Sequence, residues 1–400
     1  MRILLMQDIG SATGGAEIQL LALREGLRAR GHEVRLMSSR VHRVPGFPVL
    51  ADYTCFGTDT KLQVLSQTFN PDAYLTLRRV LNTFRPDVVH VRLFLWQLSP
   101  TILPLLRSVP SVYQAAMYKP ICPLGTKQLP DGTPCTTPAG RVCLDQCLTP
   151  QTWAVLMLQL QLWKVWRDAF RATVVLSTAM KARMEADPLC PVTPLEIIHN
   201  GVPERPMRPP LAGPPRVMYA GRLVPEKGID VLMRAFAPVS QQLPTAELHI
   251  AGMGPEEEPL RALADQLGIQ DQVHWLGYLS RADLEAHFDQ AWVQAVPSQW
   301  EEPFGNVGTE AHMRGTALVA SRVGGQIDIV DEGTTGFLIS PTDEAGWTQA
   351  LLHLLSNRER AEAMGQAGRQ RALAHFSEDR CVERFLALYE RIQHTPVTHA

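Results

Sequence analysis

The strongest constraint on the fold of this chain is a pattern of short, β-branched apolar runs that alternate with amphipathic helical sequence. Residues 2–6 form the first run, a Gly-Gly-Ala-Glu loop follows at 14–17, and helical periodicity over 18–30 ends at Gly31. Further runs lie beside helical sequence at 31–36, 87–91, 109–113 and 173–177. This alternation predicts a parallel sheet with helices on its faces.

The pattern begins again beyond a Pro-rich stretch at 200–215, whose turn residues and weak periodicity predict a linker. Strand-like runs then recur at 216–221, 247–252, 273–277, 291–297 and 317–320. A length of 400 residues also favours more than one core. We therefore expect an α/β protein with doubly wound domains at 1–200 and 201–376, and a C-terminal helix within 377–400 that packs back on the first domain.

Composition excludes several classes of protein. The formal net charge of -2 gives no basic excess of the kind that follows a phosphate backbone, so nucleic acid is not an expected partner. No apolar stretch reaches the roughly 18 residues of a membrane span, and the apolar start is too short for a signal peptide, which predicts a cytoplasmic protein. In such a compartment, the seven cysteines favour buried thiols, metal ligands or catalytic groups over disulfides.

Two cations stand in the loop after the run at 216–221. Ligands of open α/β sheets bind beyond the carboxyl ends of the strands, which makes this loop a candidate site. Arg222 and Lys227 could neutralise a diphosphate, the first through its planar fork and the second as a point charge. We expect both on an exposed loop, and when the pair is taken alone a solvated basic loop is the favoured interpretation.

The segment 298–310 offers carboxylates and a helix start after the run at 291–297. Glu302 lies in the loop and Glu310 on the following helix, while Gly305 and Asn306 would present backbone amides suited to phosphate. Glu310 could then accept hydrogen bonds from ribose hydroxyls, and Glu302 from an attached sugar. A helix with exposed carboxylates near its N-terminus is the simpler alternative.

Taken together and in order, these motifs resemble those of the family-4 glycosyltransferases of GT-B fold over nearly the whole chain. The matching segments are 14–17, 200–202, 221–228, 302–310, 324–325 and 333–337. The resemblance implies two Rossmann-like domains facing across a cleft and a retaining transferase that uses a nucleotide sugar, with a UDP-sugar as the default donor. The acceptor would be a glycan, a lipid-linked molecule or a small molecule.

The resemblance also implies a role for each motif residue. Arg222 and Lys227 would bind the diphosphate, Glu310 the ribose and Glu302 the donor sugar, and the donor would also meet Phe304, Gly305, Asn306 and, from the N-terminal domain, Gly15. In this family the departing phosphate oxygen is usually thought to accept the proton of the acceptor. Because the chain has no Asp-x-Asp triplet, we expect no metal on the diphosphate and no cofactor in catalysis.

The N-terminal half carries the acceptor-side candidates. His90 and Arg92 end the run at 87–91, and Gln114 follows the next run, although a strand-end histidine is commonly structural. The segment 153–170 combines tryptophans with basic residues, which suits either peripheral contact with the inner face of a membrane or a core helix.

Cysteines gather in a Pro- and Gly-rich insertion: Cys122, Cys135, Cys143 and Cys147. Four thiolates could hold a structural zinc ion tetrahedrally, but the spacings match no standard module, so free thiols or a disulfide pair remain open.

One expected pair is missing. Many relatives carry His-Asp six residues before a Cys-Pro that matches 122–123, where this chain has Ala116-Met117. Neither side chain can hydrogen bond a sugar hydroxyl. We expect a slow transferase, with His90 or Gln114 in compensation. A non-catalytic nucleotide-sugar-binding protein and a GT-B epimerase or hydrolase are the alternatives.

Overall fold

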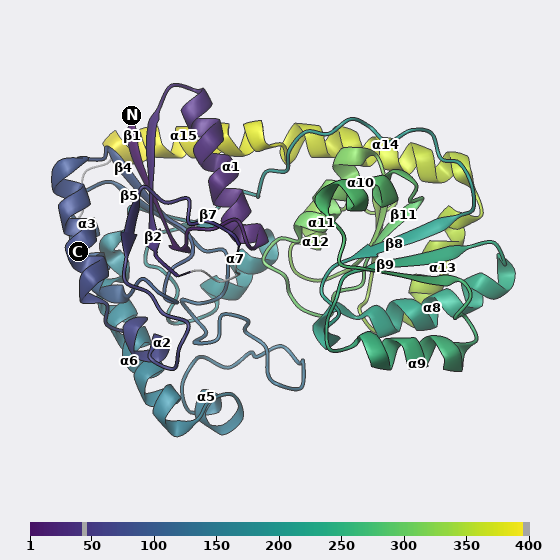
Figure 1. Ribbon diagram of the computed structural model, residues 1–400, viewed down its shortest axis with the longest axis horizontal. Helices are drawn as coiled ribbons and strands as arrows, with labels where there is room; N and C mark the ends of the chain where they lie inside the picture. The colour runs from purple at the N-terminus through teal and green to yellow at the C-terminus, as the bar shows by residue number, and fades with distance from the viewer. Residues whose placement is uncertain (42–45, 395–400) are drawn as a thin grey trace. The chain divides into compact units, whose positions relative to one another are not determined.

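The computed structural model describes residues 1–41 and 46–394 and divides the chain into two compact units, each built on one parallel sheet (Figure 1). One unit consists of Met1–Gly201 together with the segment from Glu378 onward, and the other is Val202–Ser377. The expected doubly wound α/β class is confirmed, because helices cover parallel strands in both units.

The N-terminal unit has a sheet of seven parallel strands in the order β3-β2-β1-β4-β5-β6-β7. Their bounds are β1 (Arg2–Ile9), β2 (Glu33–Ser39), β3 (Tyr53–Cys55), β4 (Val88–Val91), β5 (Ser111–Gln114), β6 (Ala172–Val175) and β7 (Leu195–Ile197). The helices are α1 (Gly15–Ala29), α2 (Gln63–Ser66), α3 (Pro71–Thr83), α4 (Leu103–Leu106), α5 (Arg141–Gln146), α6 (Pro150–Trp166), α7 (Thr178–Glu185) and α15 (Glu378–His394).

The core of this unit depends on the last helix of the described chain. Leu20 and Leu27 of α1 share a buried cluster with Phe385 and Tyr389 of α15 and with the apolar residues of β1 and β2. Helix α15 packs against α1 in this cluster, and Arg30 after α1 bonds Asp379, 349 positions away, so a distant segment completes the first domain.

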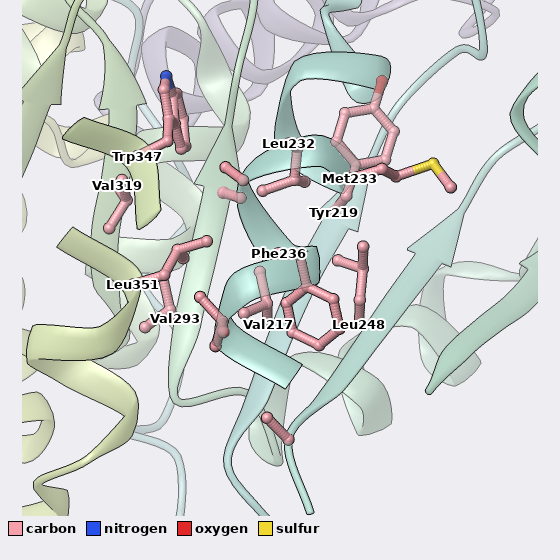
Figure 2. Packing of buried hydrophobic residues seen from close by; sticks show 14 of the residues in the cluster. Val217, Tyr219, Leu232, Met233, Phe236, Leu248, Val293, Val319, Trp347 and Leu351 are labelled. Atoms are coloured by element: carbon pink, nitrogen blue, oxygen red, sulfur yellow. The ribbon is translucent and has the colours of Figure 1, made fainter. Parts of the chain in front are cut away.

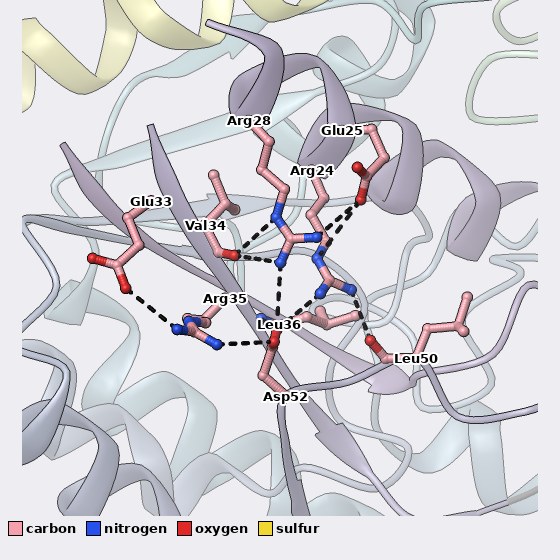
Figure 3. Close-up of polar contacts among 9 residues, drawn as sticks. All are labelled: Arg24, Glu25, Arg28, Glu33, Val34, Arg35, Leu36, Leu50 and Asp52. Carbon is pink, nitrogen blue, oxygen red and sulfur yellow. Dashed lines mark hydrogen bonds and ion pairs between the residues drawn. The ribbon is translucent and has the colours of Figure 1, made fainter. Parts of the chain in front are cut away.

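A polar cluster fixes the edge of the same sheet (Figure 3). The Asp52 carboxylate accepts a hydrogen bond from the Leu36 backbone amide at 2.7 Å and from the Arg24 guanidinium at 3.1 Å. Arg35 and Arg28 approach the same carboxylate at 3.5 and 3.9 Å. The carboxylate therefore ties the loop before β3 to α1 and β2.

The second unit has six parallel strands in the order β10-β9-β8-β11-β12-β13. Their bounds are β8 (Arg216–Ala220), β9 (Glu247–Ala251), β10 (Val273–Gly277), β11 (Val293–Val296), β12 (Ala317–Ser321) and β13 (Gly336–Ile339). The helices are α8 (Ile229–Gln242), α9 (Glu257–Leu267), α10 (Arg281–Asp289), α11 (Asn306–Arg314), α12 (Gln326–Ile329), α13 (Glu344–Leu355) and α14 (Arg358–His375).

Alternate residues of each strand supply the two faces of this sheet. Val217 and Tyr219 pack with α8, α9 and α13, whereas Met218 belongs to a smaller cluster with α10. Figure 2 shows Phe236 and Trp347 beside the strand residues of the larger cluster, and both rings are fully buried. Burying one large apolar side chain stabilises a fold by about 1.5–3 kcal/mol, so this cluster dominates the unit.

The sequence pattern missed three strands: β3, β7 and β13. All three are short strands of three or four residues at the edges of their sheets. The first strand also runs beyond the expected residue 6 to Ile9 because polar Asp8 is satisfied inside the sheet. Its carboxylate accepts hydrogen bonds from the amides of residues 96–98 at 2.6–2.9 Å.

None of the helices in the described ranges combines the length and hydrophobicity of a membrane-spanning segment.

Candidate functional site

The strand order of the second unit reverses between β8 and β11, which are neighbours in the sheet. In open α/β sheets, ligands bind beyond the carboxyl ends of the strands at such a reversal. The loop after β8 carries Arg222 and Lys227, and the loop after β11 carries Glu302 and leads into α11. Arg222, Lys227 and Glu302, which the sequence assigned to a donor, therefore lie on two neighbouring loops.

Lys227 and Glu302 form the central contact between these loops. The Lys227 Nζ lies 2.7 Å from Glu302 Oε1, and the two side chains are only 20% and 13% exposed. They belong to a hollow lined by Tyr219, Ala220, Lys227, Ala295, Val296, Pro297, Ser298, Glu302 and Val307. The expectation that Lys227 stands on an exposed loop is wrong, because the loop after β11 covers it.

Gly228 explains how the two loops come so close. Its φ of +64° is left-handed, and a Cβ there would lie 2.1 Å from the Pro297 carbonyl oxygen. The Gln299 amide also donates to the Glu226 carbonyl at 2.9 Å. Only glycine fits this contact, which places Lys227 beside Glu302.

Arg222 differs from Lys227 in its surroundings. Its side chain is 68% exposed and pairs with Glu226 at 3.3 Å. The Tyr219 hydroxyl donates to the Arg222 carbonyl at 2.8 Å and so fixes the backbone rather than the guanidinium. Arg222 can therefore turn toward an anion at little cost.

A Gly-Gly pair supports the loop that carries Glu302. A Cβ on Gly324 would lie 2.4 Å from the Glu302 carbonyl oxygen, and a Cβ on Gly325 would lie 2.2 Å from that of Phe304. Gln326, which follows, is 1% exposed and donates to the Gly305 carbonyl at 3.4 Å. Sequence reasoning missed Gln326, although its place directly after the glycine pair was a usable signal.

A second pair of glycines supports the loop that carries Arg222. A Cβ on Gly252 would lie 1.7 Å from the Gly221 carbonyl oxygen, and a Cβ on Gly254 would lie 2.0 Å from that of Leu223. Between them, Met253 accepts a hydrogen bond from the Leu223 amide at 3.0 Å. The Gly-x-Gly after β9 was visible in the sequence, and its role was not recognised.

Helix α11 begins beside the hollow. Gly305 at its N-cap has a φ of +96° and no side chain to cap the helix, and Asn306 is its first residue. The Phe304 ring is 2% exposed and packs on Phe376, so Phe304 can offer a ligand its backbone but not its ring. The start of α11 follows the loop of Glu302 directly in the chain, and a helix N-terminus is a place where backbone amides suit an anion.

Glu310, one turn further along α11, lies in a different hollow from Glu302. That hollow is lined by Pro203, Arg205, Glu285, Phe288, Glu310, Met313 and Arg314.

The acceptor-side candidates lie inside the N-terminal unit. His90 has no exposed surface, and its ring nitrogens lie 2.6 Å from the Tyr389 hydroxyl and 3.1 Å from Gln114 Oε1. Burial lowers the pKa of His90 to about 3. The Arg92 guanidinium donates to Gln114 and Asn200, and burial lowers its pKa to about 10. This network favours a structural role for His90, Arg92 and Gln114. Gly15, also in this unit, is the first residue of α1.

The four cysteines of the insertion form no disulfide. Cys122, Cys135, Cys143 and Cys147 are all free, and Cys122 and Cys143 are buried. Burial, followed by the repulsion of the neighbouring thiolates, raises the pKa of Cys147, and burial also raises that of Cys143. Zinc at these thiols stays a prediction.

Helix α6 has one buried and one exposed side. Trp163 is fully buried, while Leu158 and Val165 are 55% and 62% exposed. Gln159 lies on the buried side, where it donates to the carbonyls of Gln67 and Leu95 at 2.6 and 3.1 Å. The helix therefore packs in the core along one side, and peripheral membrane contact by the other stays a prediction.

The chain is similar in sequence to known glycosyltransferases. Residues 14–201 match the model of the glycosyl transferase 4-like domain, and residues 205–371 match that of glycosyl transferases group 1. A relative is the GDP-mannose-dependent alpha-(1-6)-phosphatidylinositol monomannoside mannosyltransferase of Mycolicibacterium smegmatis, 38% identical over 165 residues, which are 40% of this chain and 43% of the relative. The glycogen synthase of Mycobacterium tuberculosis is 32% identical over 186 residues, 46% of this chain and 45% of the relative. Each match thus spans less than half of the relative.

Two solved structures match the fold of this chain over nearly its full length. Sucrose-phosphate synthase from Thermosynechococcus elongatus has a TM-score of 0.73 at 21% identity and covers 98% of this chain and 99% of its own. HepE of Anabaena in complex with UDP has a TM-score of 0.70 at 18% identity and covers 98% and 100%. These similarities show the GT-B fold. With both domain models matched in order, the chain belongs to the family-4 glycosyltransferases of GT-B fold.

Proposed function

We propose that this chain transfers a sugar from a nucleotide-sugar donor to an acceptor with retention of configuration. The observation that carries the proposal is the approach of Lys227 to Glu302 at the strand reversal, beside the start of α11. A cation and helix amides suit a diphosphate, and a carboxylate can accept hydrogen bonds from sugar hydroxyls. Lys227 and Arg222 would bind the diphosphate, and Glu302 would accept hydrogen bonds from the sugar hydroxyls.

The proposed chemistry uses these groups to stabilise the leaving diphosphate. The bond between the anomeric carbon and the phosphate oxygen breaks, and the acceptor oxygen bonds to that carbon on the same face. The acceptor's proton passes to the departing phosphate. The cations and the amides of α11 stabilise the developing negative charge, and removing one such donor lowers the rate by roughly 10²–10³. The proposal includes no metal on the diphosphate.

The relatives suggest two alternatives for the nucleotide of the donor, UDP and GDP, and both are to be tested. One relative is named as GDP-mannose-dependent, and one solved structure contains UDP. We propose a panel of UDP- and GDP-sugars, read by thermal stabilisation of the full chain. A ligand at a hundred times its dissociation constant should stabilise the folded state by about 2.7 kcal/mol.

Transfer itself is tested with the donor that stabilises most. The wild type should release nucleotide and form a glycoside, and Lys227→Ala and Arg222→Ala should each lose about a hundredfold in rate. Arg234→Ala is the matched control, because this partly exposed cation of α8 lies outside both loops. Glu310→Ala should mainly weaken binding of the free nucleotide. Full turnover in either loop variant would contradict the proposal.

A non-catalytic nucleotide-sugar-binding protein is the second candidate, favoured by Ala116 and Met117 in place of the family's His-Asp pair. Because His90 and Gln114 bond each other inside the core, we no longer propose that they compensate. Loss of one polar contact typically costs about 1–3 kcal/mol, which slows a reaction without abolishing it. Donor binding without nucleotide release across a broad acceptor panel would favour the binder.

A further inference from the structure

Three metal-ligating side chains meet on the second sheet, outside the proposed donor loops. Glu247 and His249 are two positions apart on β9, so they point to the same face. His274 on β10 stands directly opposite His249 in the parallel register. One candidate ligand atom from each of Glu247, His249 and His274 lies within 4.8 Å of the other two.

A fourth side chain reaches the same face from α10. The His287 ring lies 5.7 Å from that of His249, and the His274 ring lies 4.6 Å from it on the β10 side. The Nδ1 atoms of His249 and His287 are both buried and have no hydrogen-bond partner among the described residues. Buried polar atoms in native proteins are normally paired, so these two nitrogens call for a ligand.

We propose that Glu247, His249 and His274 bind a divalent transition-metal ion, Zn²⁺ in preference, with His287 as a fourth ligand. Imidazole and carboxylate are ordinary zinc ligands at bond lengths of about 2.0–2.2 Å, which put tetrahedral ligand atoms roughly 3.3 Å apart. The His249 Nε2 and Glu247 Oε2 lie 3.0 Å apart as a hydrogen-bonded pair, and a metal bound by both residues would replace this bond.

Arg216 opposes a cation, since its guanidinium donates to Glu247 Oε2 at 2.8 and 3.0 Å. The metal therefore competes with Arg216 for the carboxylate, and removing Arg216 should strengthen metal binding.

The place of the site suggests what the metal would do. Glu247 is the first residue of β9, whereas the donor loops follow the carboxyl ends of β8 and β11. Strand β10 is an edge strand, paired with β9 alone in the described sheet. A metal shared by β9, β10 and α10 would fasten this edge, and the inference does not depend on the proposed transfer reaction.

The test is titration of the metal-free full chain with Co²⁺, followed by absorption, and with Zn²⁺, followed by calorimetry. The wild type should bind one equivalent whose cobalt spectrum shows ligand-field bands without thiolate charge transfer, which separates this site from the cysteines. His274→Gln on the edge strand should weaken this binding at least about tenfold, the smallest loss seen when even an outer-shell partner is removed. His353→Gln, a histidine of α13 that packs on Phe337, should leave it unchanged.

Arg216→Gln supplies a result of opposite sign. It should tighten Co²⁺ binding severalfold, which a histidine cluster of purely structural origin would not do. The proposal is overturned if the wild type shows no thiolate-free equivalent, or if His274→Gln and His353→Gln bind Co²⁺ alike. Circular dichroism of each variant confirms that the comparison is made on folded protein.

Discussion

Replacing Lys227 by Met should lower both the stability of the fold and the rate of transfer, and comparison with Arg222→Met separates the two effects. The Lys227 and Glu302 side chains are only 20% and 13% exposed and lie 2.7 Å apart. Fully exposed pairs contribute about 0–1 kcal/mol, whereas removing one partner of a buried pair costs about 3–5 kcal/mol. For this partly buried pair we expect a loss of about 1–3 kcal/mol, because Glu302 keeps its charge without a partner. Such a loss lowers the melting temperature of a domain of this size by about 2–12 °C.

Arg222→Met is the matched comparison, since its side chain is 68% exposed. Its stability should change by no more than about 0.5 kcal/mol, while its turnover falls as far as that of Lys227→Met. Denaturant unfolding of Lys227→Met, Glu302→Gln and the double variant completes a cycle, for which we expect a coupling energy of about 1–2 kcal/mol. Zero coupling, or equal stability of Lys227→Met and Arg222→Met, would refute the reasoning.

Three further predictions concern other parts of the chain. Gly228→Ala should lower the melting temperature and weaken donor binding, because the new Cβ would lie 2.1 Å from a carbonyl oxygen. Gly213 is the control, since it also has a positive φ but nothing lies within 4 Å of its added Cβ. Gly213→Ala should therefore lose only the backbone cost, about 1 kcal/mol. The folded-state pKa of His90, about 3, lies below its ordinary 6.5, so its contribution to stability is complete above about pH 6.5 and is lost as pH falls toward 3. Unfolding of His90→Gln between pH 4 and 6 should therefore lack a slope of about 1.4 kcal/mol per pH unit that the wild type shows. Elemental analysis of the native protein should find zinc bound at the thiols of 122–147. This zinc should be lost when those thiols are alkylated under denaturing conditions and the chain is refolded. Reactive thiols and no such zinc in the native protein would contradict the prediction of a zinc site there.

The sequence predicted the fold and the donor loops because both depend on local patterns. Lys227 and Gly228 stand beside each other in the chain, and the strand that they follow has a clear apolar run. The partners of His90 could not be read in this way, since Tyr389 is 299 positions away. A buried histidine and a histidine in a cleft look alike until the helix that covers them is known.

The same limit applies to Gln326 and to the histidines of β9 and β10. Each of these residues is polar, and its structural role depends on a neighbouring residue from another helix or strand. The place of Gln326 after the glycine pair was a signal, but its partner could not be predicted, because that partner is the backbone of Gly305. His249 and His274 were hidden because strand register, rather than spacing, brings them together.

The return of α15 to the first unit has a consequence for synthesis. The chain leaves the first unit at Gly201 and re-enters it at Glu378, and the Val202 amide bonds the Phe376 carbonyl at 2.8 Å where the two connections run together. On the ribosome, Val202–Ser377 is continuous and can fold as soon as it emerges, whereas the first unit must wait for Phe385 and Tyr389. The domain translated first is therefore the one completed last. Until then the apolar side of α1 is a surface on which chaperones can act.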